Sequence, residues 1–184
     1  PLLYIGAEPV FVDIDPRTMN VSIEDIRRKM DASIKAIVTV DYGGICCNYE
    51  EINKIAHEYG IPVIQDAAHA IGSKYDGQWV GSFSDFSIFS FQAIKTLTTG
   101  DGGLLAIKNP NLLELAKKVR WFGIDRSKKQ GGVWENDIVD VGYKYQMTDI
   151  AAAIGIAGLG QIAQTIAHRK SLFQAYEENL RGVK

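Results

Sequence analysis

The strongest constraint on the fold is an alternation of short apolar runs with a capped helical segment. The runs at 34–40 and 61–65 have the length and apolar content of buried strands. Between them, Asn48 can cap a helix over 49–59, and Gly60 can end it. A strand, a helix and a second strand in this order are typical of parallel strands joined by a crossover. The sequence therefore predicts an α/β protein with a largely parallel sheet.

The rest of the chain extends this pattern without an internal repeat. Further strands are expected at 9–15, 86–91 and 104–107, and further helices at 22–30, 110–120 and, in two parts divided near Gly160, 148–180. The polar stretch at 123–137 has no clear period and predicts a surface loop. With 184 residues and 46% hydrophobic content, the chain can bury a core and is expected to form one domain.

Charge and apolar patterning argue against two classes of partner. The chain has 20 Lys and Arg against 22 Asp and Glu, a formal charge of -2, and neither sign gathers into a run. A nucleic-acid partner is therefore not expected. No segment has the apolar length of a membrane span, and the start has no basic leader. We expect a cytoplasmic protein with no membrane partner.

The two cysteines, Cys46 and Cys47, are adjacent in the chain. A disulfide between neighbours would be strained, and a metal site would need ligands from elsewhere. We expect reduced structural thiols and no metal site. A redox or sulfur-transfer role for these thiols is the minor alternative, because nothing nearby would activate them.

Lys95 is the strongest candidate for a catalytic residue in the sequence. It follows a predicted strand and precedes a loop rich in hydroxyls and glycine, Thr98–Gly103, which suits a phosphate. A desolvated lysine amine gives up its proton and attacks a carbonyl more readily. Asp66 follows the run at 61–65, and ligands of open α/β sheets gather at the carboxyl ends of strands. The pair favours a Schiff-base lysine for pyridoxal phosphate, with a carboxylate at the pyridine nitrogen.

Each of these residues also has a plain structural explanation when it is taken singly. A lysine after a strand is usually a solvated surface charge, and Asp66 can cap the segment that follows it. His69 can be a structural histidine whose hydrogen bonds are made within the protein, and Ser90 can be a serine packed inside the fold. The loop at 98–103 alone is no stronger evidence than a lone glycine motif.

The joint pattern changes this balance, because its blocks resemble the DegT-like sugar aminotransferases. These are fold-type I pyridoxal phosphate enzymes that act on nucleotide-linked keto sugars. The matching blocks cover nearly the whole chain and are GAEPVFVDID at 6–15, VIQDAAHA at 63–70, FSF at 89–91 with Lys95, TTGDGG at 98–103, GY at 142–143 and MTDI at 147–150. The resemblance implies a three-layer α/β sandwich with a mostly parallel central sheet.

The resemblance also implies a role for each matching site residue. Lys95 matches the lysine that forms the Schiff base with the cofactor, and Asp66 matches the acid that pairs with the pyridine nitrogen. His69 matches a position, His or Gln in the family, that lies against the cofactor near its ring hydroxyl. Ser90 matches the hydroxyl that contacts the cofactor phosphate.

Two positions depart from the family pattern. Lys144 stands where members commonly have an Asn that reaches the phosphate of the neighbouring subunit's cofactor. Lys144 still offers a cation to a phosphate, but without the geometry of an amide. Asp101 stands where Glu is usual, which shortens the reach by one methylene.

The chain also lacks two parts that the family pattern implies. It starts at Pro1 without an initiating methionine and ends at Lys184 after a helical pattern. The N-terminal part of the large domain and the smaller C-terminal domain are not among its residues. We therefore expect residues 1–184 to be the central part of the cofactor-binding large domain.

The implied activity is transfer of an amino group from an amino acid, expected to be glutamate, to a nucleotide-linked keto sugar. The kinetics are expected to be ping-pong and the intact protein a homodimer. A deoxysugar dehydratase with the same cofactor is one alternative, but that branch has His where this chain has Lys95. A truncated or degenerate domain without catalysis is the other, favoured by the missing parts and Lys144.

Overall fold

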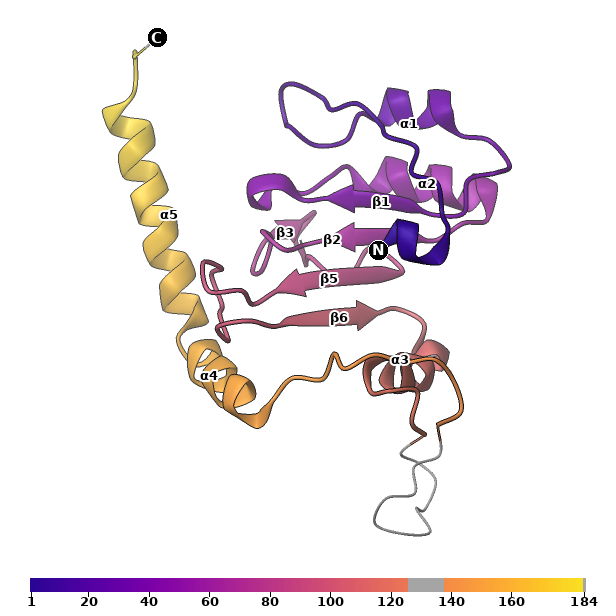
Figure 1. The fold of residues 1–184 in the computed structure, drawn as a ribbon. Helices are drawn as coiled ribbons and strands as arrows, with labels where there is room; N and C mark the ends of the chain where they lie inside the picture. The colour runs from indigo at the N-terminus through magenta and orange to yellow at the C-terminus, as the bar shows by residue number, and fades with distance from the viewer. Residues whose placement is uncertain (126–137, 184) are drawn as a thin grey trace.

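A four-stranded sheet organises the computed structural model, which describes residues 1–125 and 138–183 (Figure 1). The strand order is β1 (Ile37–Val40), β2 (Val63–Asp66), β5 (Phe86–Ser90) and β6 (Gly103–Ile107). The first three strands are parallel, and β6 runs antiparallel to β5. This confirms the predicted α/β class with a mostly parallel central sheet.

Two helices cover one face of the sheet. α1 (Ile23–Lys29) begins after Ser22, and α2 (Tyr49–Tyr59) begins after Asn48. Each capping side chain accepts a hydrogen bond from a backbone N–H of the first turn. Gly60 ends α2 with a φ of 65°, which glycine adopts without strain. The predicted helix at 22–30 and the predicted cap and end of α2 are confirmed.

The main core lies between these helices and the sheet. Its buried side chains come from α1, α2, β1, β2 and the turn before α2, and they are Ile26, Ile37, Cys47, Tyr49, Ile52, Ile55, Ala56 and Val63. Ile52 and Ile55 are three residues apart and therefore lie on the same face of α2. Burial of one such side chain contributes about 1.5–3 kcal/mol.

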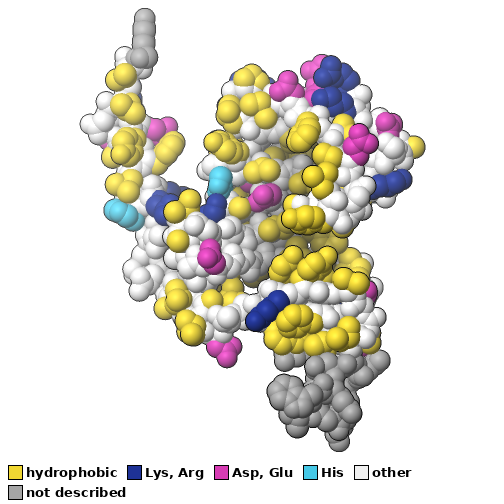
Figure 2. All heavy atoms as spheres, viewed as in Figure 1, with side chains coloured by type: hydrophobic (Ala, Val, Ile, Leu, Met, Phe, Trp, Pro, Cys, Tyr) yellow, Lys and Arg dark blue, Asp and Glu magenta, His cyan; other side chains and the backbone are white. Residues whose placement is uncertain are grey.

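The alternation of side chains along each strand gives the sheet two different faces. The face toward α1 and α2, here called the closed face, includes the buried row Thr39, Gln65 and Ser87. The opposite face, here called the open face, includes the next row, Val40, Asp66, Ile88 and Leu105. Val40 and Ile88 are 46% and 44% exposed. In Figure 2, hydrophobic side chains gather over the region where Figure 1 shows the strands.

The second half of the described chain is helical beyond β6. A 3₁₀ turn at Pro110–Leu112 leads into α3 (Leu113–Arg120), as expected from Pro110 in the first turn. α4 (Asp149–Leu159) and α5 (Ile162–Asn179) follow, and the break between them confirms the division near Gly160. α5 runs along one side of the molecule (Figure 1). Most of the loop predicted at 123–137 lies outside the described residues.

No single helix in the described part of the chain combines the length and the apolarity of a membrane span. α4 and α5 reach the necessary length and apolarity only when they are taken together, and a bend of 61° separates them.

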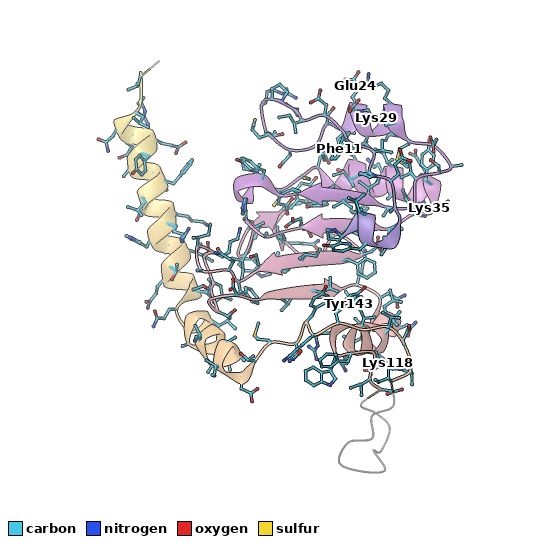
Figure 3. The ribbon with its side chains drawn as sticks, viewed as in Figure 1. Phe11, Glu24, Lys29, Lys35, Lys118 and Tyr143 are labelled. Atoms are coloured by element: carbon cyan, nitrogen blue, oxygen red, sulfur yellow. The ribbon has the colours of Figure 1, made fainter. Side chains whose placement is uncertain are left out.

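The strand predicted at 9–15 is wrong. After the 3₁₀ turn at Leu2–Ile5, this segment is extended, but its one bridge joins Ile14 to Val21. Side chains of α1 form hydrogen bonds with the backbone of this segment instead. The Lys29 Nζ donates to the Phe11 carbonyl at 2.7 Å, and the Asp25 carboxylate accepts from the Asp13 N–H. Figure 3 labels Lys29 and Phe11. An apolar run alone does not show whether a neighbouring strand is present to pair with it.

A small hairpin was missed by the sequence reasoning. β3 (Lys74–Tyr75) and β4 (Gln78–Trp79) pair antiparallel around Asp76 and Gly77. These two residues have φ of 46° and 75°, as a two-residue hairpin turn requires. The Asp-Gly dipeptide was the signal that could have found it.

Candidate active site

The sheet brings three predicted site residues to one edge. Asp66 is the last residue of β2, Ser90 is the last residue of β5, and Lys95 lies in the loop that joins β5 to β6. Because β1, β2 and β5 are parallel, their carboxyl ends meet at this edge. Asp66 pairs in register with Ile88, two residues before Ser90 on the same face. This agrees with the predicted placement of Asp66 and Lys95 at strand ends.

Asp66 is held by its backbone and leaves one carboxylate oxygen available. Its carbonyl accepts from the Asp41 N–H at 3.0 Å, and its Oδ1 accepts from the Ala68 N–H at 3.0 Å. The side chain is half-buried, and its second oxygen has no protein partner within residues 1–125 and 138–183. A carboxylate placed in this way can accept a hydrogen bond from a cationic ring nitrogen.

His69 lies on the loop after β2 and contacts the loop after β1. The Gly43 N–H donates to His69 Nδ1 at 3.3 Å, and the Tyr42 ring meets the imidazole edge-on with centroids 5.9 Å apart. These partners belong to the 3₁₀ turn at Tyr42–Gly44. Because Nδ1 accepts, the neutral imidazole carries its proton on Nε2, which becomes a donor. His69 is exposed, so this donor is accessible to a ligand.

Ser90 and Lys95 lie on the β5 end and the loop that follows. Both side chains are half-buried. The Ser90 Oγ accepts from the Gln92 N–H at 3.3 Å, and the Lys95 N–H donates to the Gln92 carbonyl at 2.9 Å. Among the described residues, the Lys95 amine has neither an ion pair nor a hydrogen bond. The amine is thus not committed to a structural partner.

The threonines of the glycine-rich loop hold the loop itself. The Thr98 hydroxyl accepts from the Gly100 N–H and donates to the Phe91 carbonyl, while Thr99 donates to the Asp101 carbonyl. The sequence reasoning offered these hydroxyls to a phosphate. In the structure they shape the connection that carries Lys95.

Helix α4 packs closely against this loop through two glycines. A Cβ at Gly155 would lie 2.9 Å from the Thr99 methyl, and one at Gly158 would lie 2.8 Å from a Leu97 methyl. At distances this short, a Cβ would force its neighbour to shift. These two glycines therefore allow a close contact between α4 and the loop of Lys95.

Lys144 lies in the segment before α4, outside the strand ends that carry Asp66 and Ser90. It is exposed and pairs in an isolated bridge with Trp121. It lines a cavity of about 660 Å³ together with the glycine-rich loop and the start of α4. Asp66, His69, Ser90 and Lys95 are not among the residues that line this cavity.

The cysteines are in an environment that suppresses thiol chemistry. Burial, followed by the nearby Asp41 carboxylate, raises the pKa of Cys46 to about 11 and that of Cys47 to about 12. Neither thiol ionises appreciably near neutral pH, and both are free of disulfides. This supports the structural role over the redox alternative. Among the described residues, no cluster of His, Cys, Asp and Glu could hold a metal ion.

The comparisons with known proteins agree with this geometry. The chain is 41% identical to the uncharacterized protein MJ1066 of Methanocaldococcus jannaschii, over 99% of its own length and 49% of that protein. It matches the putative sugar aminotransferase Spr1654 of Streptococcus pneumoniae, in its PMP form, with a TM-score of 0.90 and 31% identity, over 98% of this chain and 51% of that one.

A further solved structure, DesI in the presence of its TDP-sugar product, matches with a TM-score of 0.87 and 30% identity. The match covers 99% of this chain and 44% of that one. The chain thus spans about half the length of the relatives it matches. A family model matches residues 1–184 in full, and the chain therefore belongs to the DegT/DnrJ/EryC1/StrS aminotransferase family.

Proposed function

We propose that the protein containing this chain is a pyridoxal phosphate-dependent aminotransferase that moves an amino group from an amino acid, expected to be glutamate, to a nucleotide-linked keto sugar. The observation that carries the proposal is the shared sheet edge, where Asp66, Ser90 and the loop of Lys95 meet. The family supplies the reaction class. The PMP form of Spr1654 and the TDP-sugar product of DesI support the cofactor and the substrate class.

The donor set at this edge fits the cofactor. It combines an uncommitted primary amine at Lys95, a carboxylate with one unpaired oxygen at Asp66, a hydroxyl at Ser90 and an N–H donor at His69. An aldehyde, a ring nitrogen, a phosphate and a ring hydroxyl are the four groups of pyridoxal phosphate that need such partners. The chemistry of the residues and that of the cofactor therefore correspond.

Each residue has a defined task in the proposed enzyme. When bound, the cofactor supplies an electron sink for the carbanion formed at the amino carbon. The Lys95 amine would hold the cofactor through its aldehyde, and the free amine would take up and return a proton at Nζ. Asp66 keeps the ring nitrogen protonated, Ser90 binds the phosphate, and His69 donates from Nε2 to the ring hydroxyl. Two half-reactions on one cofactor make the kinetics ping-pong.

We further propose that Lys144 serves the site of a second subunit in a homodimer. Its place in the segment before α4, on a cavity whose lining does not include the other four residues, supports this assignment. Residues 1–184 would then be the central part of the large domain, with an N-terminal segment and a small C-terminal domain elsewhere in the protein.

The test is replacement of Lys95 by Ala in the full reading frame that contains residues 1–184. We expect loss of the visible absorbance band of the bound cofactor and loss of half-transamination with glutamate. Lys35→Ala, at an exposed lysine before β1, is the matched control and should retain both. Survival of the band and of half-transamination in Lys95→Ala would exclude Lys95 as the anchor.

Asp66→Asn separates the proposed roles of the two residues. This variant should still bind the cofactor but transfer protons much more slowly, because an amide does not hold the ring nitrogen in its charged form. An undiminished rate would refute the role of Asp66. A wild-type protein that folds but shows neither band nor half-transamination would support the alternative without catalysis.

A further inference from the structure

A chain of buried hydrogen bonds crosses three strands behind the candidate site. It starts at Asp41, directly after β1, whose Oδ2 accepts from the Gln65 amide Nε2 at 2.7 Å. The Gln65 Oε1 in turn accepts from the Ser87 hydroxyl at 2.7 Å. Through side chains on the closed face, Asp41, Gln65 and Ser87 therefore join the carboxyl ends of β1 and β2 to the first half of β5.

The Asp41 carboxylate is the centre of this chain. Its Oδ1 accepts from the Cys47 N–H at 3.0 Å and from the Tyr49 hydroxyl. Asp41, Gln65 and Tyr49 are fully buried, and no Lys, Arg or His forms an ion pair with Asp41 in the described ranges 1–125 and 138–183. A buried carboxylate without a cation depends on such donors, so the loss of one leaves a costly defect.

The network lies directly behind residues of the candidate site. Gln65 immediately precedes Asp66, and alternation turns their side chains to opposite faces of the sheet. The Asp41 N–H also donates to the Asp66 carbonyl at 3.0 Å. The turn that follows Asp41 carries Gly43, whose N–H donates to His69. The Asp41 side chain thus fixes a segment whose backbone N–H groups bond the Asp66 carbonyl and the His69 ring.

We propose that Asp41 is a positioning residue for the site, holding the ends of β1 and β2 through Gln65 and Ser87 so that Asp66 and His69 keep their places. This inference rests on the proposed function for what the site does. Asp41 does not touch the reacting groups. Its effect passes through the backbone of residues 66–69, and a small displacement there changes rate strongly.

The direction of each hydrogen bond allows a matched exchange experiment. In Asp41→Asn, Oδ1 can still accept from Cys47 and Tyr49, but the new amide N–H₂ faces the Gln65 amide N–H₂. If the Gln65 amide turns over to accept from the new amide, the Ser87 hydroxyl loses its acceptor. In Gln65→Glu, two carboxylates face each other. In the double variant Asp41→Asn with Gln65→Glu, the amide donates to the carboxylate, and the carboxylate introduced at position 65 remains an acceptor for Ser87. The double variant keeps the total charge and restores every pairing.

Four measurements on the full reading frame separate positioning from stability. They are the unfolding temperature without cofactor, amide hydrogen exchange of residues 66–70 without cofactor, the visible circular dichroism of the bound cofactor, and kcat and KM for half-transamination. For Asp41→Asn we expect faster exchange at 66–70 and a weaker dichroic band. We also expect a kcat about tenfold to a hundredfold lower, with KM changed less than about threefold. The double variant should recover kcat to within about threefold of wild type.

Two results would overturn the inference. One is an Asp41→Asn variant with a lower unfolding temperature but unchanged exchange, dichroism and kcat, which would make Asp41 purely structural. The other is a double variant that regains its unfolding temperature but not its kcat. If Asp41→Asn does not fold, Ser87→Ala tests the far end of the network, where an unchanged kcat and dichroic band would also overturn the inference.

The outcome for the wild type distinguishes failure of the proposed function from failure of the positioning role. A wild type with no cofactor band and no half-transamination overturns the proposed function and this inference with it. If the wild type shows the cofactor band and half-transamination, and all the variants show them equally, only the positioning role is overturned.

Discussion

The two faces of the central sheet obey the same alternation but have different chemistry. On the closed face, Thr39, Gln65 and Ser87 are buried under the helices, and Gln65 and Ser87 join the network of Asp41. On the open face, apolar side chains such as Val40 and Ile88 remain about half exposed. Gln65 and Ser87 are therefore enclosed together with hydrogen-bond partners, although the Thr39 hydroxyl is buried without one among the described residues, and apolar groups are exposed on the face that carries Asp66.

This contrast shows how one strand end can serve packing and chemistry together. Gln65 and Asp66 are adjacent on β2, and their side chains point to opposite faces of the sheet. The two side chains also differ in their hydrogen bonding. The buried amide has a hydrogen-bond partner at its nitrogen and at its oxygen, whereas the carboxylate keeps an unpaired oxygen at the edge of the open face. A rigid closed face can hold a reactive group in place on the other side.

The largest expected effect comes from truncating the closed face. Ile55→Ala removes a fully buried side chain and should lower the free energy of unfolding by about 2–5 kcal/mol. Ile88→Ala, on the open face, is the matched control and should cost less than about 1 kcal/mol, since its side chain is 44% exposed. Urea unfolding of both variants measures the difference. Equal losses would show that the open face is covered in solution.

A smaller effect is expected from the thiol of the closed face at alkaline pH. Burial and Asp41 raise the pKa of Cys47 to about 12. Above the unfolded thiol pKa of about 8.5, the unfolded chain loses a proton that the folded chain retains. The free energy of unfolding should therefore fall as pH rises from about 9 toward 12, by up to about 1.4 kcal/mol per pH unit.

Cys47→Ala should remove this part of the alkaline slope. Unfolding measured under reducing conditions at several pH values checks the prediction. Cys46→Ala serves as a comparison, because that thiol is only half-buried and its pKa is raised less, to about 11. A slope that stays the same in Cys47→Ala would contradict the prediction.

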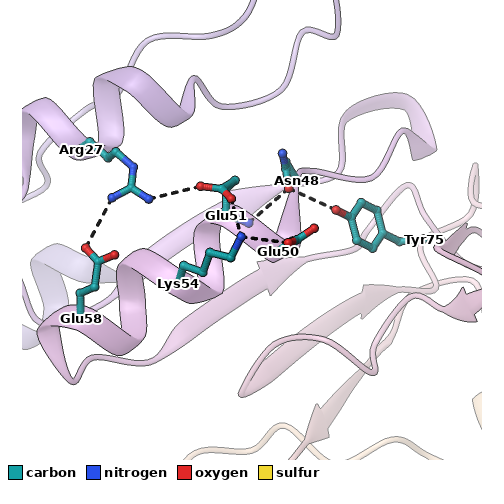
Figure 4. A network of polar contacts seen from close by, with 7 residues as sticks. All are labelled: Arg27, Asn48, Glu50, Glu51, Lys54, Glu58 and Tyr75. Carbon is teal, nitrogen blue, oxygen red and sulfur yellow. Dashed lines mark hydrogen bonds and ion pairs between the residues drawn. The ribbon is translucent and has the colours of Figure 1, made fainter.

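The smallest effect is expected on the outer surface of the closed side, where ion pairs join the two helices (Figure 4). Arg27 of α1 reaches Glu51 at 3.2 Å and Glu58 at 3.4 Å on α2. Exposed pairs of this kind are weak and are screened by salt. Arg27→Ala should therefore change the urea midpoint by only a small fraction of the Ile55→Ala effect, and high salt should remove the difference. A loss comparable to that of Ile55→Ala would show that these pairs anchor α1.

Some of the fold was predictable because its signals are local. Ser22 and Asn48 cap helices through hydrogen bonds within a few residues, and Gly60 ends α2 through its own backbone conformation. The Asp-Gly turn of the hairpin was equally local, although the signal was not used. The run at 9–15 has the apolar content of a strand, but side chains of α1 form hydrogen bonds with its backbone groups. No pattern within the run itself indicates these contacts.

The candidate site was predictable only in part. A position at a strand end placed Asp66 and Lys95 near one edge, because parallel strands end together. The cavity on which Lys144 lies depends on how the segment before α4 packs, which its sequence does not reveal. The roles of these residues at the cofactor stay predictions.

The sequence by itself determined the alternation of strands and helices, the helix caps and the family, since all of these are properties of neighbouring residues or of ordered motifs. Only the tertiary structure decided that Asp41, Gln65 and Ser87 form one buried network behind Asp66. The reason is physical: these residues lie 22 to 46 positions apart in the chain, and their hydrogen bonds exist only once the strands have paired in this order and register.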